Sequence, residues 1–204
     1  MFKIEKQYSL DWAHRVYNQC LDGEMCESKT PVQKCLRLHG HTGTFIIGLK
    51  SNQLYNDMVI DYNMLGFVKK TINDYLDHRM MIFQNDPLIA SILVPQVSVL
   101  TGEPVKEVKL DPVAELSIEG KFTVSKVDLS QFEDRKDSPH YQMLDAILVT
   151  SFNSASEMIA MWMYYLVKNK IDKYNADNPD RNNIQVDFVT YKETPTSAAT
   201  YCEN

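Results

Sequence analysis

Alternating apolar and polar residues predict that the chain begins with a β-strand. Residues 2–14 carry apolar side chains at near-alternate positions, which is the period of a strand with one buried face. Residues 44–50 are also predicted to form a strand, and residues 184–188 alternate cleanly enough to predict the last strand. The two early strands, joined by a long loop over residues 18–34, could pair antiparallel.

Two segments have the period of an amphipathic helix instead. Between Asp61 and His78, apolar residues recur at intervals that place them on one helical face. These residues are Leu65, Val68, Ile72, Tyr75 and Leu76. A second helix is predicted to begin at residues 154–157, Ser-Ala-Ser-Glu, which fit a capping box. Its buried stripe is predicted to contain Ile159, Trp162, Met163 and Leu166.

Composition and charge narrow the class of protein. With 204 residues, 44% hydrophobic and 24% charged, the chain is predicted to be one globular domain over residues 1–204. The sequence has no run of about 18 apolar residues, so no membrane span is predicted. The N-terminus lacks an apolar signal region. We therefore expect a cytoplasmic protein with reduced thiols. The net charge of −6 argues against nucleic acid as the main partner.

The sequence His39-Gly40-His41 indicates a metal site. Residues i and i+2 of a strand face the same side, and their backbones lie roughly 7 Å apart, so both imidazoles could converge on one cation. His14, at the end of the first predicted strand, is the best candidate for a third ligand. Three histidines with an open fourth position form a catalytic zinc site. The alternative is that these are three ordinary histidines.

Cys35 lies four residues before His39 and allows two interpretations. It could act as a base if its thiol ionises, or it could be a fourth zinc ligand that closes the site and makes it structural. A separate structural zinc on Cys20, Cys26 and Cys35 is conceivable, although the paired C-x2-C spacing is missing. Neither Cys202 nor His140 is assigned a role.

Five short motifs, in order, resemble the 6-pyruvoyl-tetrahydropterin and 6-carboxytetrahydropterin synthase family. The matching blocks cover residues 2–17, 35–83 and 151–201. The motifs are Ala13-His14-Arg15, Cys35 with His39-Gly40-His41, residues 58–62, Leu76-Asp77-His78, Ser156-Glu157 and residues 191–194. Ala13-His14-Arg15 and Cys35 with His39-Gly40-His41 count as one motif, which supplies the metal-binding histidines and the thiol. Residues 84–150 interrupt the family pattern.

The resemblance implies an α+β tunnelling fold, in which an antiparallel sheet carries two helices on one face. Residues 84–150 would be a β-rich insert, with a hairpin near Glu119-Gly120; it could be a lid, an oligomer contact or decoration. The resemblance also implies trimers stacked into a homohexamer, with active sites between subunits.

The resemblance assigns roles to individual residues. His14, His39 and His41 would hold Zn²⁺, which acts as a Lewis acid on a substrate oxygen. The proton-transfer set would be Cys35, Asp77 and His78, and histidine suits this task because its pKa lies near neutrality. The substrate-binding set would be Glu193, Ser156 and Glu157. A carboxylate such as Glu193 could accept both hydrogens of a pterin's amidine-like N–H pair. Without the resemblance, a simple helix end is the favoured interpretation of Asp77-His78, and Ser156-Glu157 could equally be a helix cap.

The substrate implied by the family is 7,8-dihydroneopterin triphosphate. Residues 35–39 and 189–194 look closer to the bacterial branch that yields 6-carboxy-5,6,7,8-tetrahydropterin, acetaldehyde and triphosphate on the way to queuosine and other 7-deazaguanines. The alternatives are the pyruvoyl branch and a non-catalytic zinc-binding module that uses its insert for a partner. Ala155 and Met158 depart from the family pattern and put the details of pterin anchoring in doubt. Four basic residues could face the triphosphate or be solvated surface charge: Arg15, Lys34, Arg37 and Lys192.

Overall fold

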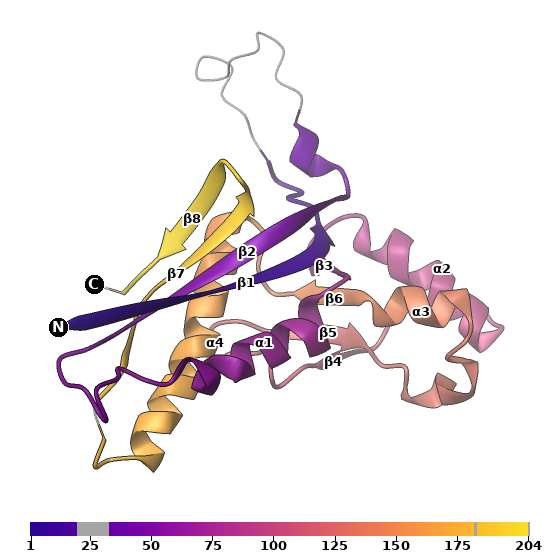
Figure 1. The fold of residues 1–204 in the computed structure, drawn as a ribbon. Helices are drawn as coiled ribbons and strands as arrows, with labels where there is room; N and C mark the ends of the chain where they lie inside the picture. Colours follow the sequence, from indigo (N-terminus) through magenta and orange to yellow (C-terminus); the bar gives the residue numbers. More distant parts are fainter. Residues whose placement is uncertain (20–32, 182, 204) are drawn as a thin grey trace, which may run out of the picture.

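The computed structural model describes residues 1–19, 33–181 and 183–203. Its main feature is one eight-stranded sheet, in the order β4-β5-β6-β3-β1-β2-β7-β8 (Figure 1). The strands are β1 (Phe2–His14), β2 (His39–Ser51), β3 (Arg79–Phe83), β4 (Leu110–Pro112), β5 (Val124–Val127), β6 (Ile147–Thr150), β7 (Gln185–Thr194) and β8 (Ser197–Tyr201). The α-helices are α1 (Gly66–Thr71), α2 (Ile89–Thr101), α3 (Pro139–Asp145) and α4 (Ser156–Asp177). Three short 3-10 helices, η1 (Lys34–Leu36), η2 (Tyr62–Leu65) and η4 (Ser130–Arg135), and one π-helix, η3 (Ile72–Leu76), complete the set. The predicted α+β class is confirmed.

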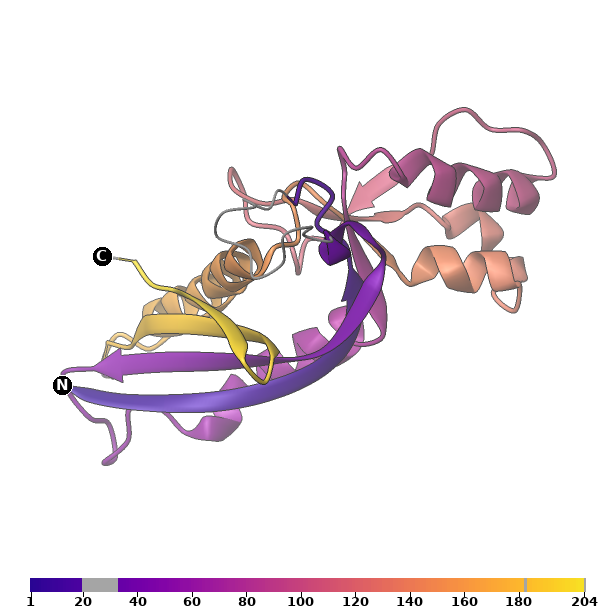
Figure 2. The same ribbon diagram turned by 90° about the horizontal axis from the view of Figure 1, so that it is seen from above.

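The strands β1 and β2 form a long antiparallel pair inside the sheet, between β3 and β7. Their register runs without a shift from Phe2 opposite Ser51 to His14 opposite His39. Figure 2 shows both strands curving together along the length of the sheet. Strand β7 then pairs antiparallel with β2, and β8 with β7. As predicted, the first strand ends where the second begins, so that His14 and His39 are direct neighbours.

The sheet is mixed, whereas the resemblance implied an antiparallel one. Strand β3 runs parallel to both β1 and β6. Parallel neighbours need a long crossover connection, and both crossovers are present because β2 and α1 lie between β1 and β3, while residues 84–146 lie between β3 and β6. The alternation of apolar residues shows which face of a strand is buried but carries no information on strand direction.

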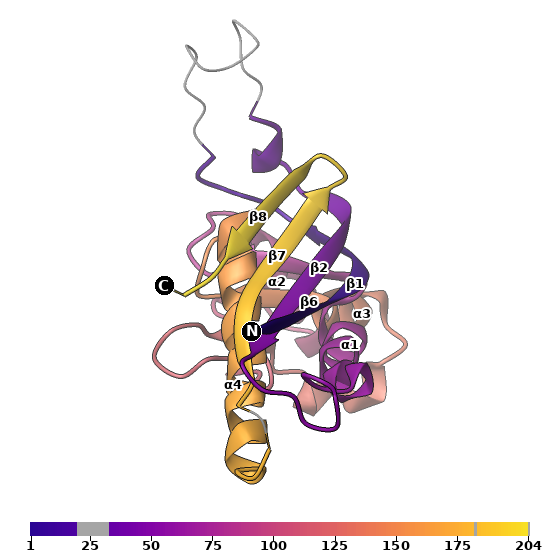
Figure 3. The same ribbon diagram turned by 60° about the vertical axis from the view of Figure 1, so that its left-hand side comes forward.

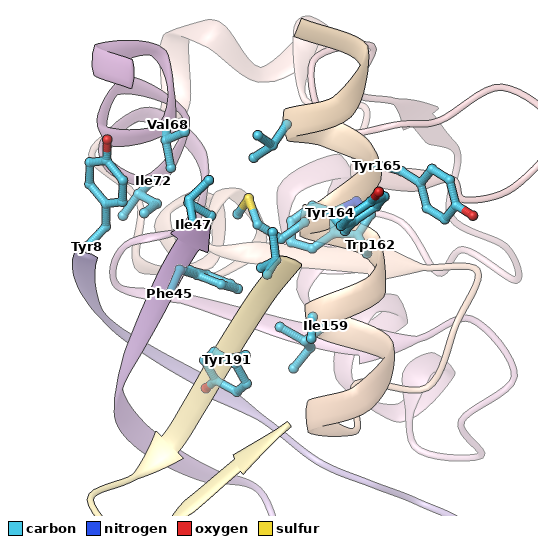
Figure 4. Packing of buried hydrophobic residues seen from close by; sticks show 14 of the residues in the cluster. Tyr8, Phe45, Ile47, Val68, Ile72, Ile159, Trp162, Tyr164, Tyr165 and Tyr191 are labelled. Atoms are coloured by element: carbon cyan, nitrogen blue, oxygen red, sulfur yellow. The ribbon is translucent and has the colours of Figure 1, made fainter. Parts of the chain in front are cut away.

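Helices α1 and α4 pack on one face of the sheet, as predicted. The inward-facing residues Phe45 and Ile47 of β2 contact the same core as Val68 of α1 and Trp162 of α4 (Figure 4). Figure 3 shows α4 lying along β7 and β8. Within the described residues, no helix is both long enough and apolar enough to cross a membrane.

The segment over residues 84–150 contains helices as well as strands, so the prediction of a β-rich insert was incomplete. Strands β4 and β5 extend the sheet, while α2 and α3 form a second hydrophobic cluster that includes Leu93 and Val97. These helices lie at the end of the molecule away from the termini (Figure 1). The expected turn is present, because Ile118 and Phe122 form a bridge and Gly120 has a φ of 70°. Helix α2 contains Pro95, and because proline is unfavourable inside a helix, the sequence does not predict one there.

Candidate metal centre

Four side chains at the end of the β1–β2 pair converge on one point. The rings of His14, His39 and His41 lie 4.7–5.2 Å apart, centroid to centroid. Glu193 on β7 joins them, and one donor atom from each of the four residues lies within 4.8 Å of the others. The structure thus brings the predicted histidines together and adds Glu193, which the sequence predicted as a substrate anchor instead.

Backbone carbonyls fix the orientation of two of the rings. Nδ1 of His14 lies 2.7 Å from the carbonyl oxygen of Ser154, and Nδ1 of His39 lies 2.8 Å from that of Arg37. An Nδ1–H that donates to a carbonyl leaves Nε2 with a free lone pair, which is the usual arrangement of a metal-binding histidine. The carbonyl of Ser154 was not predictable, because a main-chain acceptor has no side-chain signal in the sequence.

The electrostatics of the cluster fit a divalent cation. Oε1 of Glu193 lies 3.0 Å from Nε2 of His14 and 3.3 Å from Nε2 of His41, yet neither buried nitrogen makes a hydrogen bond of regular geometry. The contact with His14 lowers the pKa of Glu193 to about 2. Burial lowers the pKa of His41, which favours the neutral ring. Neutral imidazoles and a carboxylate are the forms that ligate a metal, and this donor set suits zinc.

Two aromatic residues, Trp12 and Tyr191, pack beside the cluster. Trp12 stacks on His14 with ring planes 9° apart, and its Nε1–H donates to the hydroxyl of Tyr191 at 2.6 Å. Burial raises the pKa of Tyr191, so this hydroxyl stays protonated. A Cβ atom on Gly43 would lie 2.6 Å from the Tyr191 ring, so only glycine fits there. These contacts were not predicted from the sequence, although Trp12 lies two residues before His14 and Gly43 two residues after His41.

Ser156 contacts the cluster, whereas Glu157 does not. The hydroxyl of Ser156 donates to Oε2 of Glu193 at 3.0 Å. The predicted capping box is wrong, because α4 is capped by Ala155 without a side-chain bond and the hydroxyl of Ser154 donates to the carbonyl of Arg15 instead. Glu157 lies on the exposed side of the first turn. Of the three predicted substrate-binding residues, the structure joins Ser156 and Glu193.

Asp77 and His78 form an acid–base pair that stands apart from the cluster. One oxygen of Asp77 lies 2.9 Å from Nδ1 of His78, and the other accepts the backbone N–H of Asp11 at 2.9 Å. This N–H lowers the pKa of Asp77, with a smaller contribution from His78. The backbone of His78 has a φ of 57°, and its side chain is 78% exposed. No contact among the described residues joins this pair to the four-residue cluster.

Cys35 is not part of the cluster. It sits in η1, where its N–H donates to Oε1 of Gln19 at 3.0 Å and its carbonyl accepts the N–H of Val16 at 2.8 Å. Its thiol is free and partly buried. Among the described residues, the metal-competent group has Glu193 as its fourth member and does not include Cys35.

The other cysteines and His140 add nothing to the cluster. Cys20 and Cys26 lie outside the described residues, and Cys202 is free and exposed. The ring of His140 contacts Gln96 in the insert.

The basic residues divide into two kinds. Arg15 turns inward, with Nε 2.6 Å from the buried carboxylate of Asp86, so it does not face a bound anion. Lys34 and Arg37 on either side of Cys35 are exposed, as is Lys192, and in the described part of the chain none of the three pairs with an acidic side chain.

The fold and the cluster together define a class: an α+β protein in which three histidines and a glutamate that could hold a metal ion gather at the end of the β1–β2 pair. The sequence model of the 6-pyruvoyl tetrahydropterin synthase family matches residues 3–204. The chain therefore belongs to this family, as its motifs indicated.

Individual relatives agree with this assignment. A 6-carboxy-5,6,7,8-tetrahydropterin synthase of Aquifex aeolicus is 32% identical over 91 residues, which are 43% of this chain and 56% of that protein. The enzyme of the same name from Haemophilus influenzae is 36% identical over 113 residues, 51% of this chain and 71% of that protein. The match thus spans little more than half of the first relative.

Solved structures share the fold. An uncharacterised protein of Wolinella succinogenes superposes with a TM-score of 0.80 at 28% identity, covering 100% of this chain and 98% of that one, so the comparison includes residues 84–150. A 6-pyruvoyltetrahydropterin synthase of Plasmodium vivax has a TM-score of 0.50 at 16% identity, covering 100% of this chain and 99% of that one, and shows likeness of fold alone.

Proposed function

We propose that the chain is a zinc-dependent lyase that converts 7,8-dihydroneopterin triphosphate into 6-carboxy-5,6,7,8-tetrahydropterin, acetaldehyde and triphosphate. The observation that carries the proposal is the convergence of His14, His39 and His41, in which the buried Nε2 atoms of His14 and His41 lack a hydrogen bond. The names of the two relatives favour the carboxy product.

The histidines would hold the ion through Nε2, because carbonyls occupy Nδ1 of His14 and His39. When bound, zinc would supply Lewis-acid polarisation of a substrate oxygen. The carboxylate of Glu193 would accept the N–H pair of the pterin, and its low pKa keeps it charged for this purpose. Lys34 and Arg37 are exposed cations that shortly precede His39 in sequence, and they would face the triphosphate.

Proton transfer would fall to Cys35 and His78. Asp77 accepts from Nδ1–H of His78, which fixes the tautomer and leaves Nε2 exposed to take or give a proton. The backbone of Cys35 is held by two hydrogen bonds, one to the side chain of Gln19 and one from the N–H of Val16. Outside the cluster, the thiol remains available as a base rather than a ligand.

We further propose that the active site forms between copies of this chain, in a homohexamer built as a dimer of trimers. Within the described residues of one chain, no hydrogen bond, ion pair or ring contact joins His78 to the cluster. Strand β1 pairs with β3 only over residues 12–14, so one edge of its first part has no strand partner among the described residues, and β8 is the last strand of the sheet. Exposed apolar side chains line a hollow with the first residues of β1: Phe2, Leu54, Met58 and Tyr62. Unpaired edges of this kind favour association.

A complementation experiment tests the shared site. Cys35→Ala and His78→Ala homomers should each be inactive. After unfolding and refolding as a mixture, they should regain a measurable fraction of wild-type turnover, because some sites then receive Cys35 from one copy and His78 from another. A mixture as inactive as the separate homomers would contradict a site between copies.

The pyruvoyl reaction is the second candidate, because the matching family model carries that name. Purified, zinc-loaded protein is incubated with dihydroneopterin triphosphate, and the products are identified by mass. Carboxypterin with acetaldehyde supports the proposal, whereas pyruvoylpterin supports the second candidate. Bound zinc without release of triphosphate would instead indicate a non-catalytic zinc-binding protein.

A further inference from the structure

The position of the Glu193 carboxylate is more specific than substrate anchoring requires. Two ligand atoms that each lie about 2.0–2.1 Å from a tetrahedral zinc ion are about 3.3 Å from one another. Oε1 of Glu193 lies 3.0 Å from Nε2 of His14 and 3.3 Å from Nε2 of His41. These two separations are those of neighbouring ligands on one ion, while the donor atom of His39 lies within 4.8 Å of the others.

The orientation of the groups supports the same interpretation. Both Nε2 atoms are buried and lack a hydrogen bond of regular geometry, although the oxygen is close enough for one. Ser156 donates to Oε2, the other oxygen of the carboxylate, and so leaves Oε1 to the cluster. A hydrogen bond to the outer oxygen is the usual way in which a ligating carboxylate is held.

We propose that Glu193 is the fourth metal ligand in the substrate-free protein. This inference rests on the metal site of the proposed function and adds a resting state to it. The centre is closed by three histidines and one carboxylate until a substrate arrives, and it opens when the N–H pair of the substrate draws Oε1 away from the ion. Glu193 thereby couples recognition of the ring system to access to the metal, which keeps water and small anions off the ion in the empty enzyme.

Zinc affinity, measured by competition with a chromophoric chelator, is the first test. Glu193→Gln preserves the shape of the side chain but removes its charge. We expect it to weaken zinc binding at least about tenfold, because mutating even the residues that hydrogen-bond the metal ligands lowers metal affinity 10–100-fold. Ser156→Ala, which leaves Oε1 in place, should have a smaller effect. Glu115→Gln removes an exposed carboxylate far from the cluster in sequence and serves as the matched control.

Cobalt substitution provides a readout independent of affinity. The visible spectrum of the Co²⁺-loaded wild type should not change when azide is added, because no ligand position is open. The Co²⁺-loaded Glu193→Gln variant should respond to azide. If the zinc affinities of the wild type and of Glu193→Gln differ by less than twofold, or if both proteins respond to azide in the same way, Glu193 is not the fourth ligand. Failure of the wild type to bind zinc at all would instead refute the metal site of the proposed function.

Discussion

Arg15 and Asp86 form a buried ion pair directly beyond the end of β1. Nε of Arg15 lies 2.6 Å from Oδ2 of Asp86, whose side chain is 0% exposed. The other oxygen of Asp86 accepts the N–H of Leu88 at 2.9 Å, just before α2 begins. Because Arg15 follows His14, this pair fastens the insert to the strand that carries a candidate metal ligand.

Replacing Asp86 should therefore destabilise the protein strongly. Asp86→Ala leaves the guanidinium of Arg15 largely buried without a partner, and removal of one member of a buried ion pair costs about 3–5 kcal/mol. Urea unfolding of metal-free protein measures the loss. Asp134→Ala, which removes an exposed carboxylate from the same insert, should change the free energy of unfolding by less than about 0.5 kcal/mol. Equal stability of the two variants would show that the pair contributes nothing.

Tyr191→Phe should lower the free energy of unfolding, because Tyr191 and Trp12 pack beside the histidines. The substitution removes the only recorded acceptor of the buried Trp12 Nε1–H in the described structure, and an unsatisfied buried donor costs about 1–3 kcal/mol. Thermal and urea unfolding of the metal-free variant measure this cost. Tyr62→Phe removes a hydroxyl from an exposed tyrosine and is the matched control. An unchanged Tyr191→Phe protein would mean that Trp12 finds another partner.

Asp187 should make the stability of the protein depend on pH. Its carboxylate lies 2.6 Å from Nζ of Lys3 and 3.0 Å from Nζ of Lys50, and these hydrogen bonds, that of Lys3 first, lower its pKa. A pKa lowered by folding contributes stability that is fully present above the unfolded-state pKa of about 4 and is lost as the pH falls through the folded-state value.

The Asp187→Asn variant isolates this contribution. At pH 7 it should be less stable than the wild type by about 1 kcal/mol, because Lys3 is mostly exposed and such pairs are weak. The difference should shrink as the pH falls below about 4. Urea unfolding between pH 2.5 and pH 7 measures both proteins. A difference independent of pH would assign the effect to packing rather than charge.

The convergence of the three histidines could be predicted because it follows from local spacing. His39 and His41 are two apart on a strand, and β1 ends at His14, so a simple antiparallel pair suffices to bring the three rings together. Glu193 was predicted as functional but with a different role. Its distance to the histidines depends on the register of β7 against β2, which has a bulge between Gly48 and Leu49 that no pattern reveals.

The features that escaped prediction depend on long-range contacts. The carbonyl of Ser154 reaches His14 across 140 positions of sequence, and main-chain acceptors look alike at every residue. Ser154 and Ser156 have the composition of a helix cap, but tertiary partners take both hydroxyls. Strand β3 is parallel because of the crossovers around it, which are set by the packing of the whole chain.

Cys35→Ala decides whether this thiol is a base or a metal ligand. The structure places Glu193, not Cys35, in the four-residue cluster, so we expect the variant to retain bound zinc with unchanged affinity. Turnover should fall by at least about 100-fold, the lower range of what a positioned acid or base contributes. Elemental analysis and chelator competition measure the metal, and release of triphosphate measures turnover. Cys202→Ala, at an exposed free cysteine, should match the wild type in both. Loss of zinc from Cys35→Ala would make the thiol a ligand, and full activity would remove it from the proton-transfer set, leaving His78 to act alone.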